Sequence, residues 1–360
     1  MRSFMRALFS SLLVAAVVLS PLLHGCGSDD GFHEPDAGQL VDAGSDGGSQ
    51  PDAGDDDAGT DAGDDAGTDA GEDAGTDAGE DAGTDAGEDG GTDAGEEWAN
   101  IRVLAANLTS GNAQSYDPGH GTRLMQGVQP DVILIQEFDY GDKSEAAVAA
   151  YVERTFPGFD YYREPRANGY LPNGVISRWP IISAGKWEDS ESPNREFVWA
   201  RIDIPGPIDL WAVSLHLLTR NASTRRTEAQ QLVGYIQERI PEDDYLIVGG
   251  DLNTDSRSEA AFSSLAAIVD VSGPHPADHN GNPNTNASRA KPYDHVFADP
   301  DLRPYQVPTV IGASTFQAGL VLDSRVYSPL TEIAPALSGD SGATNMQHMG
   351  VVKDFRVPAN

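Results

Sequence analysis

The chain has 360 residues, a formal net charge of −34 and a single cysteine. One cysteine excludes an intramolecular disulfide, so a folded domain must be stable through its own apolar core. The acidity is uneven, because 25 of the 57 acidic residues precede Trp98, which leaves 32 acidic and 21 basic residues from there onward. The extreme charge is therefore mainly a property of the N-terminal part and says little about an active site.

Residues 1–26 have the pattern of an export signal. Two arginines precede the apolar run Ala7–Leu23, which ends in Leu23-His24-Gly25-Cys26. A basic start, an apolar middle and a small-residue cleavage site are typical of secretory signals. The last four residues resemble a bacterial lipobox, which implies lipidation of Cys26 and anchoring in a membrane, and Gly27 after it implies the outer membrane or cell surface. A plain signal peptide or an uncleaved anchor are the alternatives.

Residues 27–97 repeat Thr-Asp-Ala-Gly and Glu-Asp-Ala-Gly, with almost no large apolar side chain after Val41. Such a segment cannot bury enough surface to offset the entropy of ordering it, so we expect a disordered acidic linker that acts as a tether. The repeat lacks the glycine-rich turn and regular apolar position of calcium-binding β-rolls. Residues 98–360 are long enough for one domain with a sizeable core.

Short apolar runs rich in Val, Ile and Leu predict buried strands along this domain. They lie at Ile101–Leu108, Asp131–Gln136, Asn173–Ser177, Phe197–Ile204, Asp209–His216, Tyr245–Gly249, Asp294–Ala298, Gly319–Leu322 and Met349–Phe355. Helical patterns are predicted at His120–Gln129, Lys143–Phe156, Ser223–Ile240 and Ser258–Ala267. The mixture predicts α/β layers with a partly antiparallel sheet. The loop Gly273–Pro292 is long enough to indicate a functional or mobile segment.

Polar side chains recur where these strands begin or end. Each one alone is more commonly a turn former or a structural group. Strands that end on a common rim would instead gather them in one cleft, on a rigid scaffold. In chain order they are Asn107, Glu137, His216, Asp251, Asn253, Asp294 and His348.

The order and spacing of these motifs resemble the endonuclease/exonuclease/phosphatase superfamily. That group includes deoxyribonuclease I, abasic-site endonucleases, neutral sphingomyelinases and inositol polyphosphate phosphatases. The resemblance implies an α/β fold of the deoxyribonuclease I type, a four-layer sandwich of two packed mixed β-sheets flanked by helices, with the site at one sheet rim. The residues that carry it are Ile135–Glu137, Asn173–Arg178, Ser214–Leu217 and Gly250–Asn253.

Hard oxygen donors suit Mg²⁺ or Mn²⁺, which bind through one or two carboxylates and keep several waters. We expect Glu137 to be the principal metal ligand, with Asn107 beside it. Asp251 and Asn253 are expected across the cleft, and all four are supported by the resemblance.

Two histidines are expected to flank the bound ester. His348, oriented by Asp294, is the candidate base that activates water, because a carboxylate partner fixes the tautomer. His216 is placed to protonate or stabilise the leaving oxygen, and Asn173 is expected to orient it. Arg195 is placed like the family's phosphate-contacting arginine, to which a guanidinium is suited. A surface ion pair is the alternative for Arg195.

One motif departs from the family pattern. The family usually carries Ser-Asp-His before the last strand, whereas this chain has Met-Gln-His, with Gln347 in place of the carboxylate. Asp340 is close enough in sequence to fold back as a substitute. The departure leaves open whether one or two metals bind. His275 and His279 of the long loop are the side chains that could join a second metal.

The sequence thus predicts a metal-dependent phosphoric ester hydrolase, which we expect to be monomeric. An extracellular nuclease or phosphodiesterase is the first hypothesis, although no basic groove is evident in the domain. A phosphodiesterase or phosphatase acting on phospholipids or small esters, like sphingomyelinases or inositol-phosphate enzymes, is the alternative. A non-catalytic surface binding module is the third.

Overall fold

The computed structural model describes residues 97–109, 119–165 and 171–360. The predicted signal, Cys26 and the acidic repeat lie outside these ranges, so export, lipidation and the disordered tether remain predictions. Within the described ranges, no helix has the length and apolarity needed to cross a membrane. The first strand begins at Trp98.

Two mixed β-sheets form the centre of the domain. The first has the order β10-β14-β1-β2-β4-β3, with β13 also paired to β14, and the second has the order β5-β6-β7-β8-β9. β1 pairs in parallel with β2, and β7 pairs in parallel with β8, whereas the other pairs are antiparallel. The strands are β1 (Trp98–Asn107), β2 (Val132–Gln136), β3 (Asp160–Arg163), β4 (Gly174–Ser177), β5 (Ile181–Trp187), β6 (Phe197–Ile202), β7 (Leu210–His216), β8 (Tyr245–Asp251), β9 (Asp294–Ala298), β10 (Gln306–Val307), β13 (Leu320–Leu322), β14 (Gly350–Pro358) and the separate hairpin β11 (Thr309–Ile311) and β12 (Ser314–Phe316).

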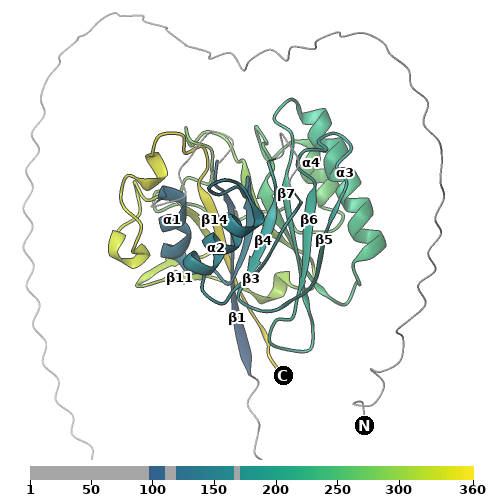
Figure 1. The fold of residues 1–360 in the computed structure, drawn as a ribbon, viewed down its shortest axis with the longest axis horizontal. Coiled ribbons are helices and arrows are strands. Elements are labelled where there is room, and N and C mark those ends of the chain that lie inside the picture. The colour runs from purple at the N-terminus through teal and green to yellow at the C-terminus, as the bar shows by residue number, and fades with distance from the viewer. Residues whose placement is uncertain (1–96, 110–118, 166–170) are drawn as a thin grey trace, which may run out of the picture. The chain divides into compact units, whose positions relative to one another are not determined.

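Helices cover the outer face of each sheet (Figure 1). α1 (His120–Val128) and α2 (Glu145–Thr155) pack on the first sheet, and α3 (Ala222–Arg239) and α4 (Ala260–Leu265) pack on the second. In the described part of the chain, the short 3-10 helices η2 (Arg303–Tyr305), η3 (Leu330–Ile333) and η4 (Asp340–Gly342) lie in the connections. The predicted four-layer α/β sandwich is confirmed.

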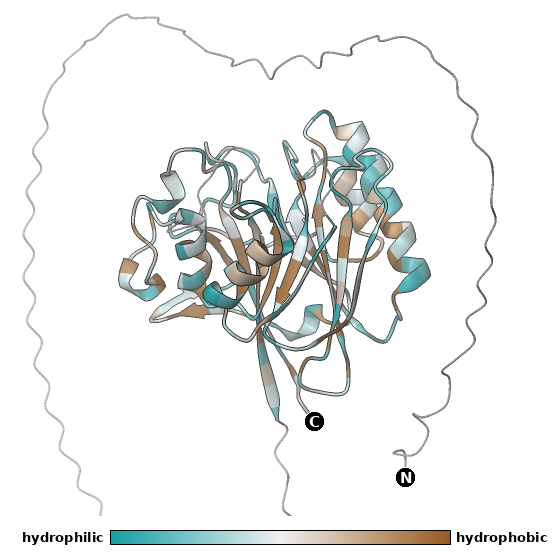
Figure 2. Cartoon of the chain, in the orientation of Figure 1, coloured by the Kyte–Doolittle hydropathy of each residue, from teal (hydrophilic) through white to brown (hydrophobic). Residues whose placement is uncertain are grey.

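Three apolar cores separate these four layers. In β1, alternate side chains point to opposite faces, so that Leu104 packs under the helices while Val103 and Ala105 pack between the sheets. A third core, around Leu232 of α3 and Val248 of β8, lies between the second sheet and its helices. Figure 2 shows the apolar residues concentrated in the strands. Each fully buried large aliphatic side chain contributes about 2 kcal/mol of transfer free energy.

Side-chain caps mark where two of the helices, α2 and α3, begin. α2 is capped by Ser144, whose side chain accepts a hydrogen bond from the amide of Ala147. α3 is capped in the same way by Asn221, which accepts from the amide of Thr224. Side-chain oxygens at these positions satisfy amides that have no partner within the helix.

The predicted strands and helices all occur, and each predicted end lies within three residues of the observed one. The prediction omitted β3 and β5, which are the edge strands of the two sheets. β5 is largely solvent-accessible except at Trp187, so it lacks the apolar run of an interior strand. The short strands β10 to β12 were omitted for a similar reason, since two or three residues show no periodicity.

Candidate active site

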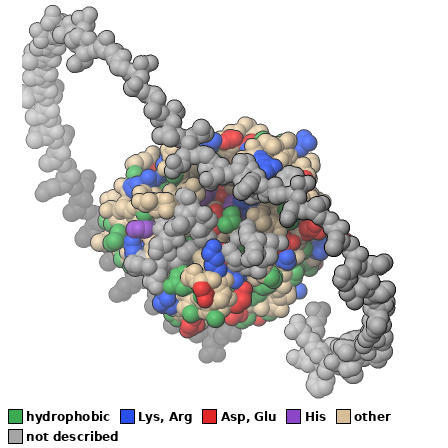
Figure 3. All heavy atoms as spheres, turned by 45° about the horizontal axis from the view of Figure 1, so that its top comes forward, with side chains coloured by type: hydrophobic (Ala, Val, Ile, Leu, Met, Phe, Trp, Pro, Cys, Tyr) green, Lys and Arg blue, Asp and Glu red, His purple; other side chains and the backbone are tan. Residues whose placement is uncertain are grey.

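Strand register places the predicted polar residues at one rim of both sheets. In the second sheet, Asp251 at the end of β8 pairs with His216 of β7 on one side and with Asp294 of β9 on the other. In the first sheet, β1 ends at Asn107, and Gln136 beside it precedes Glu137. Figure 3 turns this rim toward the reader and shows acidic side chains near its centre.

Asp251 is the hub of the cluster and is almost fully buried. Its Oδ2 lies 3.0 Å from Nδ2 of Asn107, 3.1 Å from Nδ2 of Asn253 and 3.2 Å from Nε2 of His216. Its Oδ1 accepts a 2.8 Å hydrogen bond from the amide of Asn253. Burial raises the pKa of Asp251 to about 7, with repulsion from Asp294 added, although His348 opposes the shift. The site therefore binds a proton readily when no cation is present.

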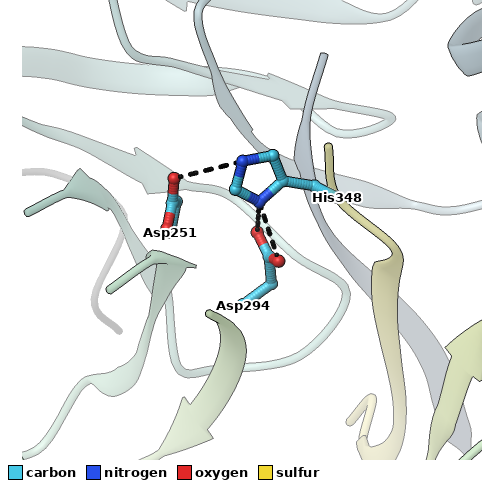
Figure 4. Close-up of side chains that lie close together, drawn as sticks. All are labelled: Asp251, Asp294 and His348. Atoms are coloured by element: carbon cyan, nitrogen blue, oxygen red, sulfur yellow. Dashed lines mark hydrogen bonds and ion pairs between the residues drawn. The ribbon is translucent and has the colours of Figure 1, made fainter. Parts of the chain in front are cut away.

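Asp294 and His348 form a buried ion pair (Figure 4). Nδ1 of His348 lies 3.0 Å and 3.2 Å from the two carboxylate oxygens of Asp294, and its Nε2 lies 3.6 Å from Oδ2 of Asp251. Burial alone lowers the pKa of His348, but Asp294 and Asp251, with a contribution from Glu137, raise it to about 9. The ring is therefore an imidazolium at neutral pH, held between two carboxylates.

The loop Gly273–Pro292 supports this ion pair. Thr285 is fully buried; its hydroxyl accepts a 2.8 Å hydrogen bond from the amide of Asp294, and its carbonyl accepts a 2.7 Å bond from the amide of Met349. Arg289 in turn pairs with Asp278 within the loop and with Asp323 outside it. The loop thus fixes the backbone at both partners, a contribution that its irregular sequence did not reveal.

His216 has the opposite environment. Nη1 of Arg195 lies 2.7 Å from Nε2 of His216, and Nε of Arg195 donates to Oγ of Ser192 at 3.1 Å. A guanidinium only donates, so in this contact Nε2 accepts and the ring proton lies on Nδ1. The 3.2 Å contact of the same Nε2 with Oδ2 of Asp251 then needs a proton on that carboxyl group. Burial, Arg195 and His348 lower the pKa of His216 well below its usual range. His216 is therefore a neutral imidazole, and Nδ1 is buried without a partner among the described residues.

Glu137 and Asn107 complete the rim. Nδ2 of Asn107 lies 3.4 Å from Oε1 of Glu137, while its Oδ1 accepts from the amide of Thr109 at 2.8 Å. Glu137 adopts a left-handed φ of 54°, which is strained for a residue with a side chain. Gly250 has a φ of 130°, and a Cβ there would lie 2.2 Å from the carbonyl oxygen of Leu215. Only glycine lets β8 reach the cluster.

These residues fit a hard divalent cation. Three buried carboxyl groups, those of Glu137, Asp251 and Asp294, offer hard oxygen donors within one cluster, next to the amides of Asn107 and Asn253. Ligand atoms of Asp251, Asp294 and His348 lie within 4.8 Å of one another and could hold an ion. His348 is itself a cation there, however, so the carboxylates of Glu137 and Asp251, joined through Asn107, are the better position for a metal.

Asn173 does not occupy its expected place. Its Nδ2 donates to the backbone carbonyl of Glu196 at 2.9 Å, and its amide donates to Glu164 at 2.7 Å. None of the hydrogen bonds within the described ranges joins it to His216, and its Oδ1 is buried without a partner there. The predicted orientation of His216 by Asn173 is therefore replaced in this structure by the contact with Arg195.

The prediction that Asp340 folds back to replace the carboxylate missing at Gln347 is wrong. Asp340 is buried at the start of η4 and pairs with Arg123 and His120 of α1. It is therefore committed to holding α1 in place. Gln347, which takes the family's carboxylate position, is exposed.

Among the described residues, the two loop histidines are not brought into a cluster of metal ligands. The ring of His279 packs edge-on against Phe316 and Tyr327, with centroids 5.0 Å and 4.6 Å away. His275 is half-buried, and burial together with Arg257 and Lys353 lowers its pKa. Neither histidine belongs to a group of potential metal ligands among the described residues.

Comparison with known proteins identifies the family of this chain. The profile of the Endonuclease/Exonuclease/phosphatase family matches residues 99–316. No curated protein sequence matches the chain. Similar solved structures include an endonuclease/exonuclease/phosphatase from Bacteroides vulgatus (14% identity, 71% of this chain and 98% of that one, TM-score 0.49), truncated Caenorhabditis elegans TDP2 (15%, 72% and 98%, 0.49) and sphingomyelinase C from Streptomyces griseocarneus (15%, 71% and 99%, 0.44). By the profile match, which spans more than half of its length, this chain belongs to the Endonuclease/Exonuclease/phosphatase family.

Proposed function

We propose that this domain is a divalent-metal-dependent phosphoesterase that hydrolyses phosphodiester bonds, and that nucleic acid outside the cell is its substrate. The observation that carries the proposal is the convergence on Asp251. Asn107 and His216 reach its carboxylate from the ends of two strands, and Asn253 and His348 reach it from connecting segments. Membership of a family of phosphoesterases is consistent with this chemistry.

Glu137 and Asp251 would hold the metal, with the amides of Asn107 and Asn253 beside them. Mg²⁺ or Mn²⁺ suits such oxygen donors. When bound, the cation would polarise the phosphoryl group and offset the carboxylate charge that keeps His348 protonated. Asn253 already donates from Nδ2 to the carbonyl of Leu217 at 2.9 Å, so its Oδ1 is the atom left for a ligand.

The two histidines would act on opposite sides of the bound ester. His348 is held through Nδ1 by Asp294, so its Nε2 is the atom that would take a proton from the attacking water. Arg195 and His216 would contact the phosphate and the leaving oxygen. An anionic oxygen between them could accept from the guanidinium, release Nε2 of His216 from that contact, and favour protonation of the ring.

We also propose that the chain is exported and lipidated at Cys26, which would place the domain at the outer membrane or cell surface. The sequence pattern of residues 1–26 supports this. Metabolic labelling with a fatty acid analogue tests it. Incorporation into the wild-type chain that disappears in Cys26→Ser is expected, and equal labelling of both chains would rule the assignment out.

Hydrolysis by the purified full-length chain tests the proposed function. Bis-nitrophenyl phosphate, plasmid DNA, RNA, sphingomyelin and inositol phosphates serve as substrates, each measured after EDTA treatment and after addition of Mg²⁺ or Mn²⁺. Metal-restored cleavage of DNA or RNA is expected. Turnover that persists in EDTA would reject the metal. Cleavage of sphingomyelin or inositol phosphates alone would favour the phospholipid or small-ester alternative, and no turnover on any ester would favour a binding module.

A further inference from the structure

Two carboxyl groups outside the rim cluster face each other in the interior. Asp189 follows β5, and Glu228 lies on α3, and neither side chain is exposed to solvent. Each affects the pKa of the other, so the two carboxyl groups lie close together, and Oδ2 of Asp189 is buried with no hydrogen-bond partner among the described residues. Two ionised carboxylates can only accept hydrogen bonds, so a hydrogen bond between them requires a proton on one of them.

The other hydrogen bonds of the pair identify where the proton is needed. Oδ1 of Asp189 accepts from the amides of Glu191 and Ser192 at 3.0 Å and 3.2 Å. The two oxygens of Glu228 lie 3.0 Å and 3.1 Å from the amide of Leu218. Oδ2 of Asp189 is buried and has no donor among the described residues if both groups are ionised. A hydroxyl on Glu228 supplies that donor.

We infer that Asp189 and Glu228 share one proton, and that this proton fixes the segment 189–195 against α3 so that Arg195 stays in contact with His216. The inference rests on the proposed function for its catalytic meaning. Asp189 and Glu228 are positioning residues here, because neither touches the rim cluster.

The contacts of the pair lead to the site along two short paths. Asp189 holds the turn at Ser192, and Oγ of Ser192 accepts from Nε of Arg195 at 3.1 Å. Glu228 holds the amide of Leu218, two residues after His216. The same proton therefore helps to position both Arg195 and His216, which are 2.7 Å apart.

No cation neutralises the pair in place of the proton among the residues that the structure describes. Arg225, one turn before Glu228 on α3, is engaged by Glu259 through two 2.8 Å hydrogen bonds. Glu191, in the turn after Asp189, adds further negative charge, and Arg195 exerts a weaker opposing effect on Glu228. Gln231 of α3 contributes only a neutral contact, by accepting from Ser190.

Loss of the shared proton should therefore disturb the site at alkaline pH. Burial and Asp189 raise the pKa of Glu228 to about 8. Above this pH two buried carboxylates repel each other with no donor between them. The segment 189–195 then separates from α3, and Arg195 leaves His216.

Glu228→Gln is the variant that separates this idea from a purely structural role. The amide keeps an acceptor for Leu218 and gives a permanent donor to Oδ2 of Asp189, so activity near neutral pH should stay within about threefold of wild type. In the wild type, kcat/KM for bis-nitrophenyl phosphate should fall by about tenfold per pH unit as pH rises above about 8, which gives the pH profile an alkaline limb. In Glu228→Gln that limb should move to higher pH, whereas Glu191→Gln, which removes a nearby charge but not the contact, should retain it.

Two readouts do not depend on turnover. Infrared difference spectra of wild type minus Glu228→Gln should contain the carbonyl band of a protonated carboxylic acid, which disappears as pH rises through about 8. The ring resonances of His216 should shift over the same range in wild type and not in the variant. Absence of the acid band would overturn the shared proton. An acid band without any change in the limb or in the His216 resonances would overturn the positioning role. A wild-type chain that cleaves no ester would refute the proposed function only.

Discussion

The two histidines of the rim occupy chemically opposite halves of one cluster. Both are buried, and both point Nε2 at Oδ2 of Asp251, at 3.6 Å for His348 and 3.2 Å for His216. They differ in the other charged residue that contacts each ring. A carboxylate, Asp294, holds His348, whereas a guanidinium, Arg195, holds His216.

The charged neighbours separate the pKa values of the two rings. The pKa of His348 is raised to about 9, while that of His216 is lowered well below its usual range. Burial acts in the same direction on both, so it cannot explain the difference. One half of the cleft therefore presents a charged imidazolium and the other a neutral imidazole next to a fixed positive charge, which suits two different tasks on one ester.

Replacing His348 gives the largest expected effect and tests whether the Asp294 half carries the proton transfer. His348→Ala should lower kcat/KM for bis-nitrophenyl phosphate by at least about a hundredfold, because it removes the general base. His120→Gln is the matched control, since its ring is 41% exposed and contacts Asp340 on η4. It should retain activity within about twofold. Comparable losses in the two variants would assign the effect to folding.

Glu137→Gln should cost about a hundredfold in kcat/KM and also weaken metal binding, because an amide oxygen replaces a charged ligand. Isothermal titration with Mn²⁺ measures the second effect directly. The exposed Glu238→Gln on α3 serves as the control and should bind Mn²⁺ like wild type. Unchanged affinity in Glu137→Gln would exclude this carboxylate as a ligand and move the metal toward the Asp294 half.

The sequence was sufficient to predict the rim because its residues mark strand ends. Asn107, His216 and Asp251 end the apolar runs that form β1, β7 and β8, and register then brings them together. Features that depend on contacts between distant residues could not be predicted. The tautomer of His216 depends on Arg195, 21 positions away, and the commitment of Asp340 depends on α1, more than 200 positions away.

The sequence indicates that Glu228 has a buried partner, but it does not identify that partner. It lies on the buried face of α3 with Arg225 and Leu232, at the three- and four-residue spacing of a helix. A charged residue on an apolar face indicates a buried partner. The sequence alone does not reveal that the partner is another acid, because Asp189 comes from the turn after an edge strand that the apolar pattern does not predict.

Arg195→Gln tests the other half of the cluster with a smaller effect. Loss of the guanidinium removes one of the charges that lower the pKa of His216, so that pKa should rise in NMR titrations. Activity should fall by about tenfold through weaker phosphate binding, mainly in KM. Arg226→Gln, an exposed arginine on α3, should change neither. An unchanged His216 titration in Arg195→Gln would mean that burial alone keeps this ring neutral.

Asp340→Asn has the smallest expected effect on catalysis, because its carboxylate serves α1 and not the cleft. Activity should remain within about twofold of wild type, whereas stability near neutral pH should fall by about 1–3 kcal/mol as the contacts with Arg123 and His120 weaken. These partners lower the pKa of Asp340, so its stabilisation is present above the usual carboxyl range and is lost as pH falls through the folded-state value. Thermal unfolding of the two chains should therefore converge in acid, while the exposed Asp243→Asn control should match wild type throughout. A large loss of turnover with unchanged stability would return Asp340 to the active site.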